Sequence, residues 1–170
     1  MTTTRPASAP PQDAATTASA PRAAEGSLLE RNLAALGERN LDIIQAIRAA
    51  EPARLDWSKA PDGSRVASLA GRALASRHAP REEAATFADA IDLRDKAVVV
   101  VLGFGLGYHI APFCERLART GLVVVLEPDV ALLRAVLSEI DLSAELGAAN
   151  VLLFQGDEAP GRYAEKFAGA

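Results

Sequence analysis

The stretch that decides the fold is residues 98–110, VVVVLGFGLGYHI. Its first five residues form a continuous apolar run, a pattern typical of a strand buried on both faces of a parallel sheet. Gly103, Gly105 and Gly107 follow directly, where the strand gives way to a helix. Such glycines permit a sharp turn that exposes backbone N–H groups. These groups can donate hydrogen bonds to an anion or to the polar edge of a cofactor. The stretch therefore predicts a strand, a candidate binding turn and a helix.

The sequence after this stretch repeats the same alternation. GLVVVLEPD (121–129) predicts a second buried strand, DVALLRAVLSEI (129–140) a helix capped by Asp129, and NVLLFQGD (150–157) a third strand. The order β-α-β-α-β favours an α/β fold with a partial Rossmann-like parallel sheet and helices on its faces. Because such nucleotide folds usually carry about five to seven strands, we expect residues 93–170 to be a half domain that is truncated.

A helical and hairpin region is predicted before the sheet, over residues 26–92. Ser27 and Glu30 suggest a capping box at the start of a helix that ends before Pro52. Gly37 and Asn40 inside that helix are expected to weaken it or divide it into two.

Two further elements complete the region. Pro61, Asp62 and Gly63 are turn residues flanked by strand-like alternation, which predicts a hairpin with Trp57 facing inward. A helix is then predicted from Pro80, which suits a first helical turn.

Composition excludes several classes of function. The chain has 170 residues and a formal net charge of -4, with no long cluster of basic residues, so we expect no nucleic acid polymer and no membrane among its partners. Residues 1–25 are rich in Ala, Thr, Ser and Pro and predict a disordered tail. With one cysteine, Cys114, and neither a secretory signal nor an apolar span, the chain is expected to be cytoplasmic.

Acidic side chains follow the second and third predicted strands. Glu127 and Asp157 are placed at the carboxyl ends of these strands, the edge where open α/β sheets bind ligands, and an acid after the second strand can accept hydrogen bonds from ribose hydroxyls. His109 lies beside the turn. The predicted cofactor-binding set is Gly103, Gly105, Gly107, Glu127, Asp157 and His109.

Structural explanations of the same residues stay open. The glycines can serve close strand–helix packing, the two acids can cap the helices that follow them, and His109 can make a structural hydrogen bond. The cofactor is left unknown, no catalytic residue is assigned, and two histidines with one cysteine predict no metal site.

Two functional alternatives also remain. The G-x-G-x-G spacing is similar to the first motif of Rossmann-like methyltransferases, which use S-adenosylmethionine, but Val101 stands where those enzymes commonly carry an acid. The second alternative is a scaffold protein. Such a scaffold either binds a nucleotide or has a glycine turn that is purely structural.

The order of motifs resembles a known family. GFGLGYH (103–109) and LEPD (126–129), followed by spaced leucines and DLS (141–143), are the most specific parts, and the resemblance covers about residues 28–157. The sequence resembles the N-terminal domain of the motility accessory factor family, also described as six-hydroxymethylpterin-pyrophosphokinase-like. These are bacterial proteins that glycosylate flagellin.

The resemblance implies a cytoplasmic role before flagellar export. It implies an enzyme that moves a nonulosonic sugar from a CMP-sugar to Ser or Thr of flagellin, with flagellin and a nucleotide or nucleotide-sugar as partners. In that family the sugar-transfer domain lies C-terminal to the Rossmann-like domain, and this sequence does not reach it. The expectation is therefore a non-catalytic domain, with GFGLGYH and Glu127 carried over as a family feature of unknown ligand.

Overall fold

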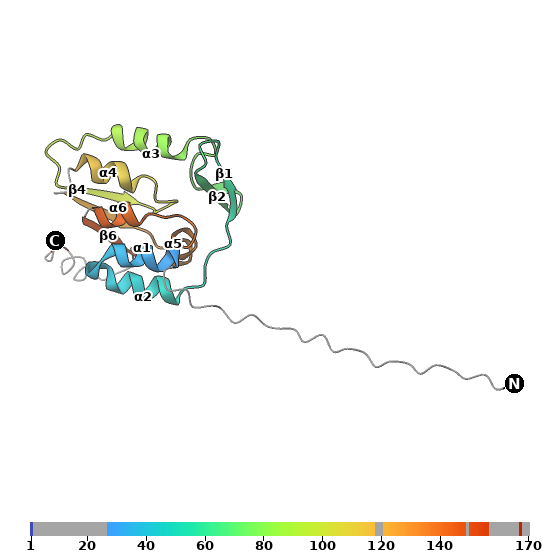
Figure 1. Cartoon of the computed structure of the whole chain (residues 1–170). Helices are drawn as coiled ribbons and strands as arrows, with labels where there is room; N and C mark the ends of the chain where they lie inside the picture. Colours follow the sequence, from blue (N-terminus) through green and yellow to red (C-terminus); the bar gives the residue numbers. More distant parts are fainter. Residues whose placement is uncertain (2–26, 118–120, 149, 157–166, 168–170) are drawn as a thin grey trace.

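The computed structural model describes residues 1, 27–117, 121–148, 150–156 and 167, and the predicted tail lies outside these apart from Met1. The described residues form an α/β fold with one parallel and one antiparallel three-stranded sheet, which confirms the predicted fold class (Figure 1). None of the helices among them has the length and hydropathy that crossing a bilayer requires.

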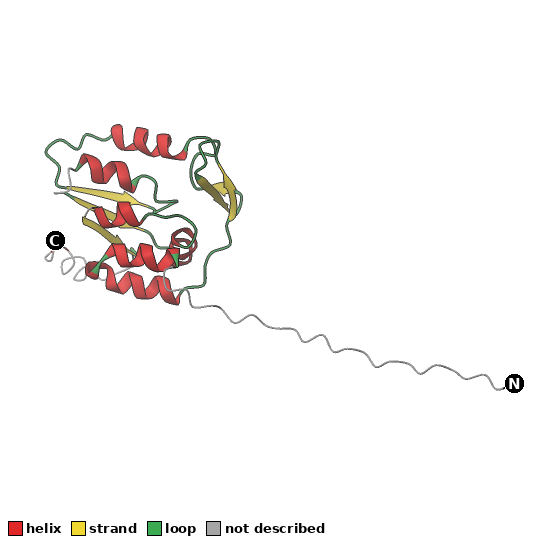
Figure 2. Ribbon diagram, viewed as in Figure 1, coloured by secondary structure: helices red, strands yellow, loops and turns green. Residues whose placement is uncertain are grey.

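The parallel sheet is built from the three valine- and leucine-rich runs. Strands β4 (Val98–Leu102), β5 (Leu122–Leu126) and β6 (Asn150–Phe154) pair in the order β4-β5-β6, with β5 in the centre. The three strands pair residue by residue from their first positions to their last. All three therefore end at the same edge of the sheet (Figure 2). The glycine turn follows β4 at that edge.

The core occupies one face of this sheet. Alternate residues of the strands, such as Val101, Val125 and Leu153, belong to a single cluster with the apolar sides of the helices. The opposite face forms a smaller cluster on β5 and β6, and on β4 it leaves Val100 and Leu102 exposed. Helices α1 to α6 belong with the first face, and on the opposite face the ring of Phe167 lies 6.0 Å from that of Phe154, centroid to centroid.

Helices connect the strands. Helix α4 (Ile110–Arg116) joins β4 to β5, and α5 (Val130–Leu137) with α6 (Ser143–Ala148) joins β5 to β6. The cap predicted for α5 is present, because the Asp129 carboxylate accepts the Leu132 N–H at 2.9 Å. Helix α6 was not anticipated from the sequence, since six residues that include Gly147 show too little helical periodicity.

The predicted N-terminal helix is divided, as Gly37 and Asn40 suggested. It consists of α1 (Leu28–Leu36), a 3₁₀ turn η1 (Glu38–Asn40) and α2 (Leu41–Ala49). Ser27 Oγ accepts the Glu30 N–H at 3.2 Å, which is half of the expected capping box. The other half is absent because the Glu30 carboxylate pairs with Arg48 at 2.6 Å.

Buried asparagines attach this helical pair to β6 and to the segment that links α5 to α6. Asn40 is fully buried; its Nδ2 donates to the carbonyls of Leu36 and Val151, and its Oδ1 accepts the Leu153 N–H at 2.8 Å. Asn32 makes an equivalent set of three bonds to residues 137, 140 and 142. Figure 1 accordingly shows α1 and α2 beside β6, with α3 and α4 near β4.

A small antiparallel sheet and one helix complete the fold. Strands β1 (Asp56–Lys59) and β2 (Arg65–Leu69) form the predicted hairpin, and a third short strand, β3 (Arg72–Ala73), extends it. Helix α3 (Pro80–Asp89) begins at the expected proline. The loop that joins β3 to α3 lies beside the glycine turn, so a segment from the first half of the chain borders the end of β4.

Candidate functional site

The glycine turn has the backbone conformation that its sequence predicts. Gly103, Gly105 and Gly107 have φ values of 92°, 52° and 77°, a region that other residues rarely adopt. The Gly103 N–H donates to the Leu126 carbonyl at 2.8 Å, and the Gly107 N–H donates to Phe104 O at 2.8 Å. The turn thus has one hydrogen bond within itself and one to the last residue of β5.

Glu127 holds the turn from the sheet side. Its side chain is buried, with an exposure of 6%, and its Oε2 accepts the Phe104 N–H at 2.8 Å. Its Oε1 accepts the N–H of Asp129 at 2.9 Å. Each carboxylate oxygen therefore already has a backbone donor, and a ribose hydroxyl would be an additional one. The predicted ribose contact of Glu127 stays a prediction.

The three glycines differ in what surrounds them. A Cβ at Gly107 would lie 2.5 Å from Leu142 Cδ1 and 3.0 Å from the Phe104 ring, so the packing there demands glycine. A Cβ at Gly105 would lie 3.3 Å from the Leu74 carbonyl oxygen, whereas one at Gly103 would meet nothing within 4 Å. The packing explanation therefore applies to Gly107 and, through the Leu74 carbonyl, to Gly105, while Gly103 borders open space.

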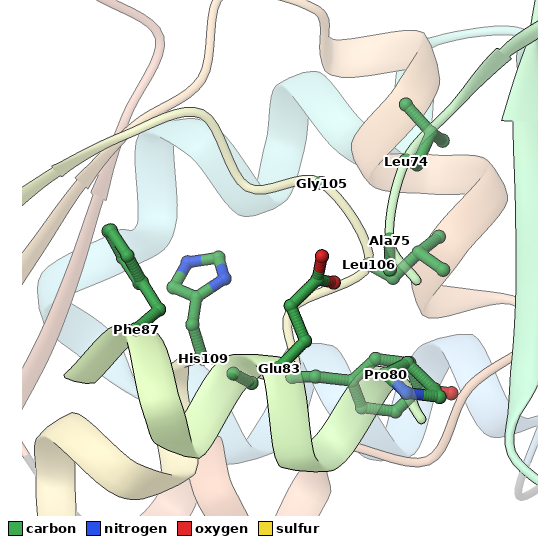
Figure 3. A pocket seen from close by; sticks show the side chains of 10 residues that line it. Leu74, Ala75, Pro80, Glu83, Phe87, Gly105, Leu106 and His109 are labelled. Carbon is green, nitrogen blue, oxygen red and sulfur yellow. The ribbon is translucent and has the colours of Figure 1, made fainter. Parts of the chain in front are cut away.

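A cavity of about 230 Å³ lies on the side of the turn that faces α3 (Figure 3). Its walls come from the loop after β3, from α3 and from the turn, and most of them are apolar. The lining residues are Leu74, Ala75, Pro80, Glu83, Ala84, Phe87, Gly105, Leu106, Tyr108 and His109. Of the predicted set, Gly105 and His109 thus share one cavity.

His109 contributes a half-buried imidazole to this cavity. Its Nε2 is shielded from solvent and has no hydrogen-bond partner among the described residues. Its ring stands edge-on to Phe113, with centroids 6.3 Å apart. Burial lowers the pKa of His109 from 6.5 to about 4, so the ring is neutral at pH 7 and offers one N–H and one lone pair.

Glu83 faces the same cavity from α3. Figure 3 shows the Glu83 side chain and the His109 imidazole both extending toward the segment that carries Gly105, and both residues line the cavity. Its Oε2 accepts the Ser76 N–H at 2.7 Å, a bond that fixes the loop ahead of α3. Sequence reasoning missed Glu83 and Phe87 as site residues, because it treated APREEA only as a helix start.

A second cavity of about 510 Å³ adjoins the first along the outer edge of β4. The two share Leu74, Phe87, Gly105 and His109, and the second also reaches Gly103. A shallower hollow of about 580 Å³ shares Leu74, Ala75 and Glu83 with the first cavity and carries Arg77 and His78. The turn therefore borders a continuous set of hollows on its α3 side.

The remaining predicted residue, Asp157, lies outside the described residues, and its role stays a prediction. Cys114 is buried, and burial raises the pKa of its thiol to about 11, so it is not a nucleophile at neutral pH. The Tyr108 hydroxyl donates to the Arg65 carbonyl at 2.7 Å. The described arrangement is suited to holding a small molecule, and it lacks a nucleophile paired with a base.

Comparison with known proteins adds one finding. The chain matches the solved structure of the MAf glycosyltransferase from Magnetospirillum magneticum AMB-1 with a TM-score of 0.53 and 18% sequence identity. The match covers 84% of this chain and 29% of that one. No family model matches the sequence, and no curated protein matches it. At this identity the match establishes a shared fold.

Proposed function

We propose that this chain is the Rossmann-like module of a motility accessory factor-type glycosyltransferase, which transfers a nonulosonic sugar from a CMP-sugar to flagellin. The module has a binding and positioning role and is non-catalytic by itself. Its working partners are flagellin and the sugar-transferring part of such an enzyme.

The fold match carries this proposal. The motifs at residues 103–109 and 126–129 resemble those of the family, and the chain matches a MAf glycosyltransferase over 84% of its own length. Motif order and backbone geometry are separate observations, and both favour the same kind of enzyme. The chain spans 29% of the length of that glycosyltransferase.

The non-catalytic role is supported by the chemistry of the described residues. Glu127 accepts from two backbone donors, the Cys114 thiol is protonated, and His109 Nε2 has no hydrogen-bond partner among the described residues. Group transfer by general base catalysis requires a base within hydrogen-bond reach of the attacking group. The cavities beside the turn instead support a binding role.

Flagellin mass tests the proposal directly. Deleting the coding region for residues 27–156 in the source bacterium should lower the intact mass of flagellin by whole nonulosonic sugar residues. An unchanged flagellin mass would contradict the proposal. An in-frame deletion of residues 1–25 is the matched control and should leave the flagellin mass unaltered.

A second experiment tests the non-catalytic part. The purified chain, mixed with a CMP-sugar and unmodified flagellin, should leave the flagellin mass unchanged. Sugar transfer by the chain alone would overturn that part. Calorimetry with S-adenosylmethionine addresses the methyltransferase alternative, and tight binding that Gly105→Val abolishes would favour it instead.

A further inference from the structure

The outer edge of β4 pairs with no described strand. On its inner edge, the Ala97 carbonyl accepts the Leu122 N–H at 2.7 Å, and the Gly103 N–H donates to the Leu126 carbonyl at 2.8 Å. Backbone groups alternate in direction along a strand, so every second residue between these two bonds directs its N–H and C=O away from β5. These outward residues are Val98, Val100 and Leu102.

The outward residues also expose apolar side chains. Val100 and Leu102 are 55% and 80% exposed, whereas Val99 and Val101 between them are buried. Natural proteins guard an open edge with lysine, proline or a bulge, because unpaired backbone groups attract other strands. The sequence of β4, VVVVL, contains neither lysine nor proline. An apolar edge of this kind is suited to the addition of a further strand.

A groove runs along this edge. The cavity of about 510 Å³ is lined by residues 99–102 of β4, by Phe87 of α3 and by Ile91. Phe87 is 51% exposed there. None of the described lining residues carries a charge at pH 7, because burial lowers the pKa of His109 to about 4. The groove therefore matches an uncharged segment with apolar side chains and disfavours a charged one.

The position of α3 favours a single segment over a second copy of this chain. Helix α3 supplies Phe87 to the groove and lies near β4 (Figure 1). In a second copy the same helix would flank the same edge, so pairing of two β4 edges would bring two α3 helices into the same space. A single extended segment carries no such helix, and about five of its residues match the length of β4.

We propose that the outer edge of β4 accepts an extended, uncharged strand from the sugar-transferring part of the enzyme, so that the sheet gains one strand. This inference rests on the proposed function, which supplies that neighbour. Permanent interfaces are more apolar than transient ones, and flagellin leaves after modification, so the permanent neighbour is the better match for an apolar groove. The glycosyltransferase that shares the fold is long enough to contain such a strand, because this chain covers 29% of it.

Amide hydrogen exchange on the full labelled chain tests the contact with two purified probes. The probes are the sugar-transferring polypeptide of the source bacterium and unmodified flagellin. In the chain alone, the outward amides of Val98, Val100 and Leu102 should exchange quickly, while Val99 and Val101 are protected by β5. The sugar-transferring polypeptide should slow exchange of the outward amides at least about tenfold, and flagellin should leave it unchanged.

Three outcomes would overturn the proposal. Outward amides already protected in the chain alone would mean that the edge is occupied, by a second copy if sedimentation gives a doubled mass. Protection by flagellin would assign the edge to the acceptor, and protection by neither probe would show that no strand docks there. An unchanged flagellin mass after deletion of residues 27–156 refutes the proposed function instead, so the two failures are distinguishable.

Two variants at one position locate the contact. Val100→Pro removes the outward N–H without removing a hydrogen bond to β5, and Val100→Thr keeps both the N–H and the branched shape. In calorimetry with the sugar-transferring polypeptide, Val100→Pro should bind at least about tenfold more weakly and Val100→Thr as tightly as the unaltered chain. Equal binding by Val100→Pro, with its fold verified by circular dichroism, would refute the edge contact. If that variant does not fold, the exchange measurement on the unaltered chain decides.

Discussion

The two sides of the glycine turn differ in how completely their polar atoms are satisfied. On the sheet side, Glu127 accepts one backbone N–H on each oxygen and is closed off from solvent. On the α3 side, His109 Nε2 is also hidden from solvent but has no partner among the described residues, and His109 lines a cavity. One loop thus has a fully hydrogen-bonded carboxylate on one side, which we call the latch, and a cavity on the other. Glu127, whose sequence position predicts a ligand contact, forms the latch.

The largest effect should come from breaking the latch. Glu127→Ala leaves the buried N–H of Phe104 and the partly buried N–H of Asp129 without their acceptor, and we expect a loss of about 3 kcal/mol in the free energy of unfolding. Urea denaturation measures it. The control Glu139→Ala breaks an exposed ion pair with Arg65 and should cost less than about 1 kcal/mol. Similar losses in the two variants would contradict the latch.

The glycines sharpen the same comparison. Gly107→Ala places a methyl group 2.5 Å from Leu142 Cδ1 in a left-handed conformation, so we expect a loss of about 3 kcal/mol. Gly103→Ala suffers only the backbone strain and should lose about 1 kcal/mol. Denaturation of both variants side by side checks the order, and a more damaging Gly103→Ala would be inconsistent with the packing described.

Lowering the pH should destabilise the folded chain through the half-buried imidazole of His109. The folded-state pKa of His109 is about 4, below the unfolded value of 6.5, so the unfolded chain binds more protons between these values. Stability should fall as the pH decreases from 6.5 to 4, by about 2 kcal/mol between pH 7 and pH 5 from this residue. His109→Phe should lose that contribution, as denaturation at the two pH values can measure. An equal fall in the free energy of unfolding in both proteins would mean that another group takes up the proton.

The smallest effect concerns the single thiol. Because burial raises the pKa of Cys114 to about 11, its reaction with a thiol reagent in the folded protein at pH 8 should be far slower than in urea. Absorbance of the released chromophore gives both rates. Comparable rates would mean that the helix carrying Cys114 is not packed as the structure shows.

The fold was largely predictable because five-residue apolar runs bounded by turn residues are compatible with few structures other than buried strands. The runs at residues 98–102, 122–126 and 150–154 could be recognised as strands, and Pro80 and Asp129 marked two helix starts. Short elements were missed: β3 has two residues and α6 has six, too few for a period to emerge.

The candidate site was less predictable, because its walls come from segments distant in the sequence. The predicted strand order placed Glu127 near the turn, and Glu127 does contact it. Nothing in the sequence indicated that both carboxylate oxygens accept backbone N–H groups. Glu83 and Phe87 reach the turn only through the path of the loop after β3. Hydrogen-bond satisfaction is a property of the folded chain, so the difference between latch and cavity required the structure.

The most direct measurement of this difference is residue-by-residue amide hydrogen exchange of the labelled chain, with and without the Glu127→Ala change. We predict that the amides of Phe104 and Asp129 are strongly protected in the unaltered chain, because they donate to the Glu127 carboxylate, and that they lose this protection in Glu127→Ala. Rapid exchange of both amides in the unaltered chain would contradict the account.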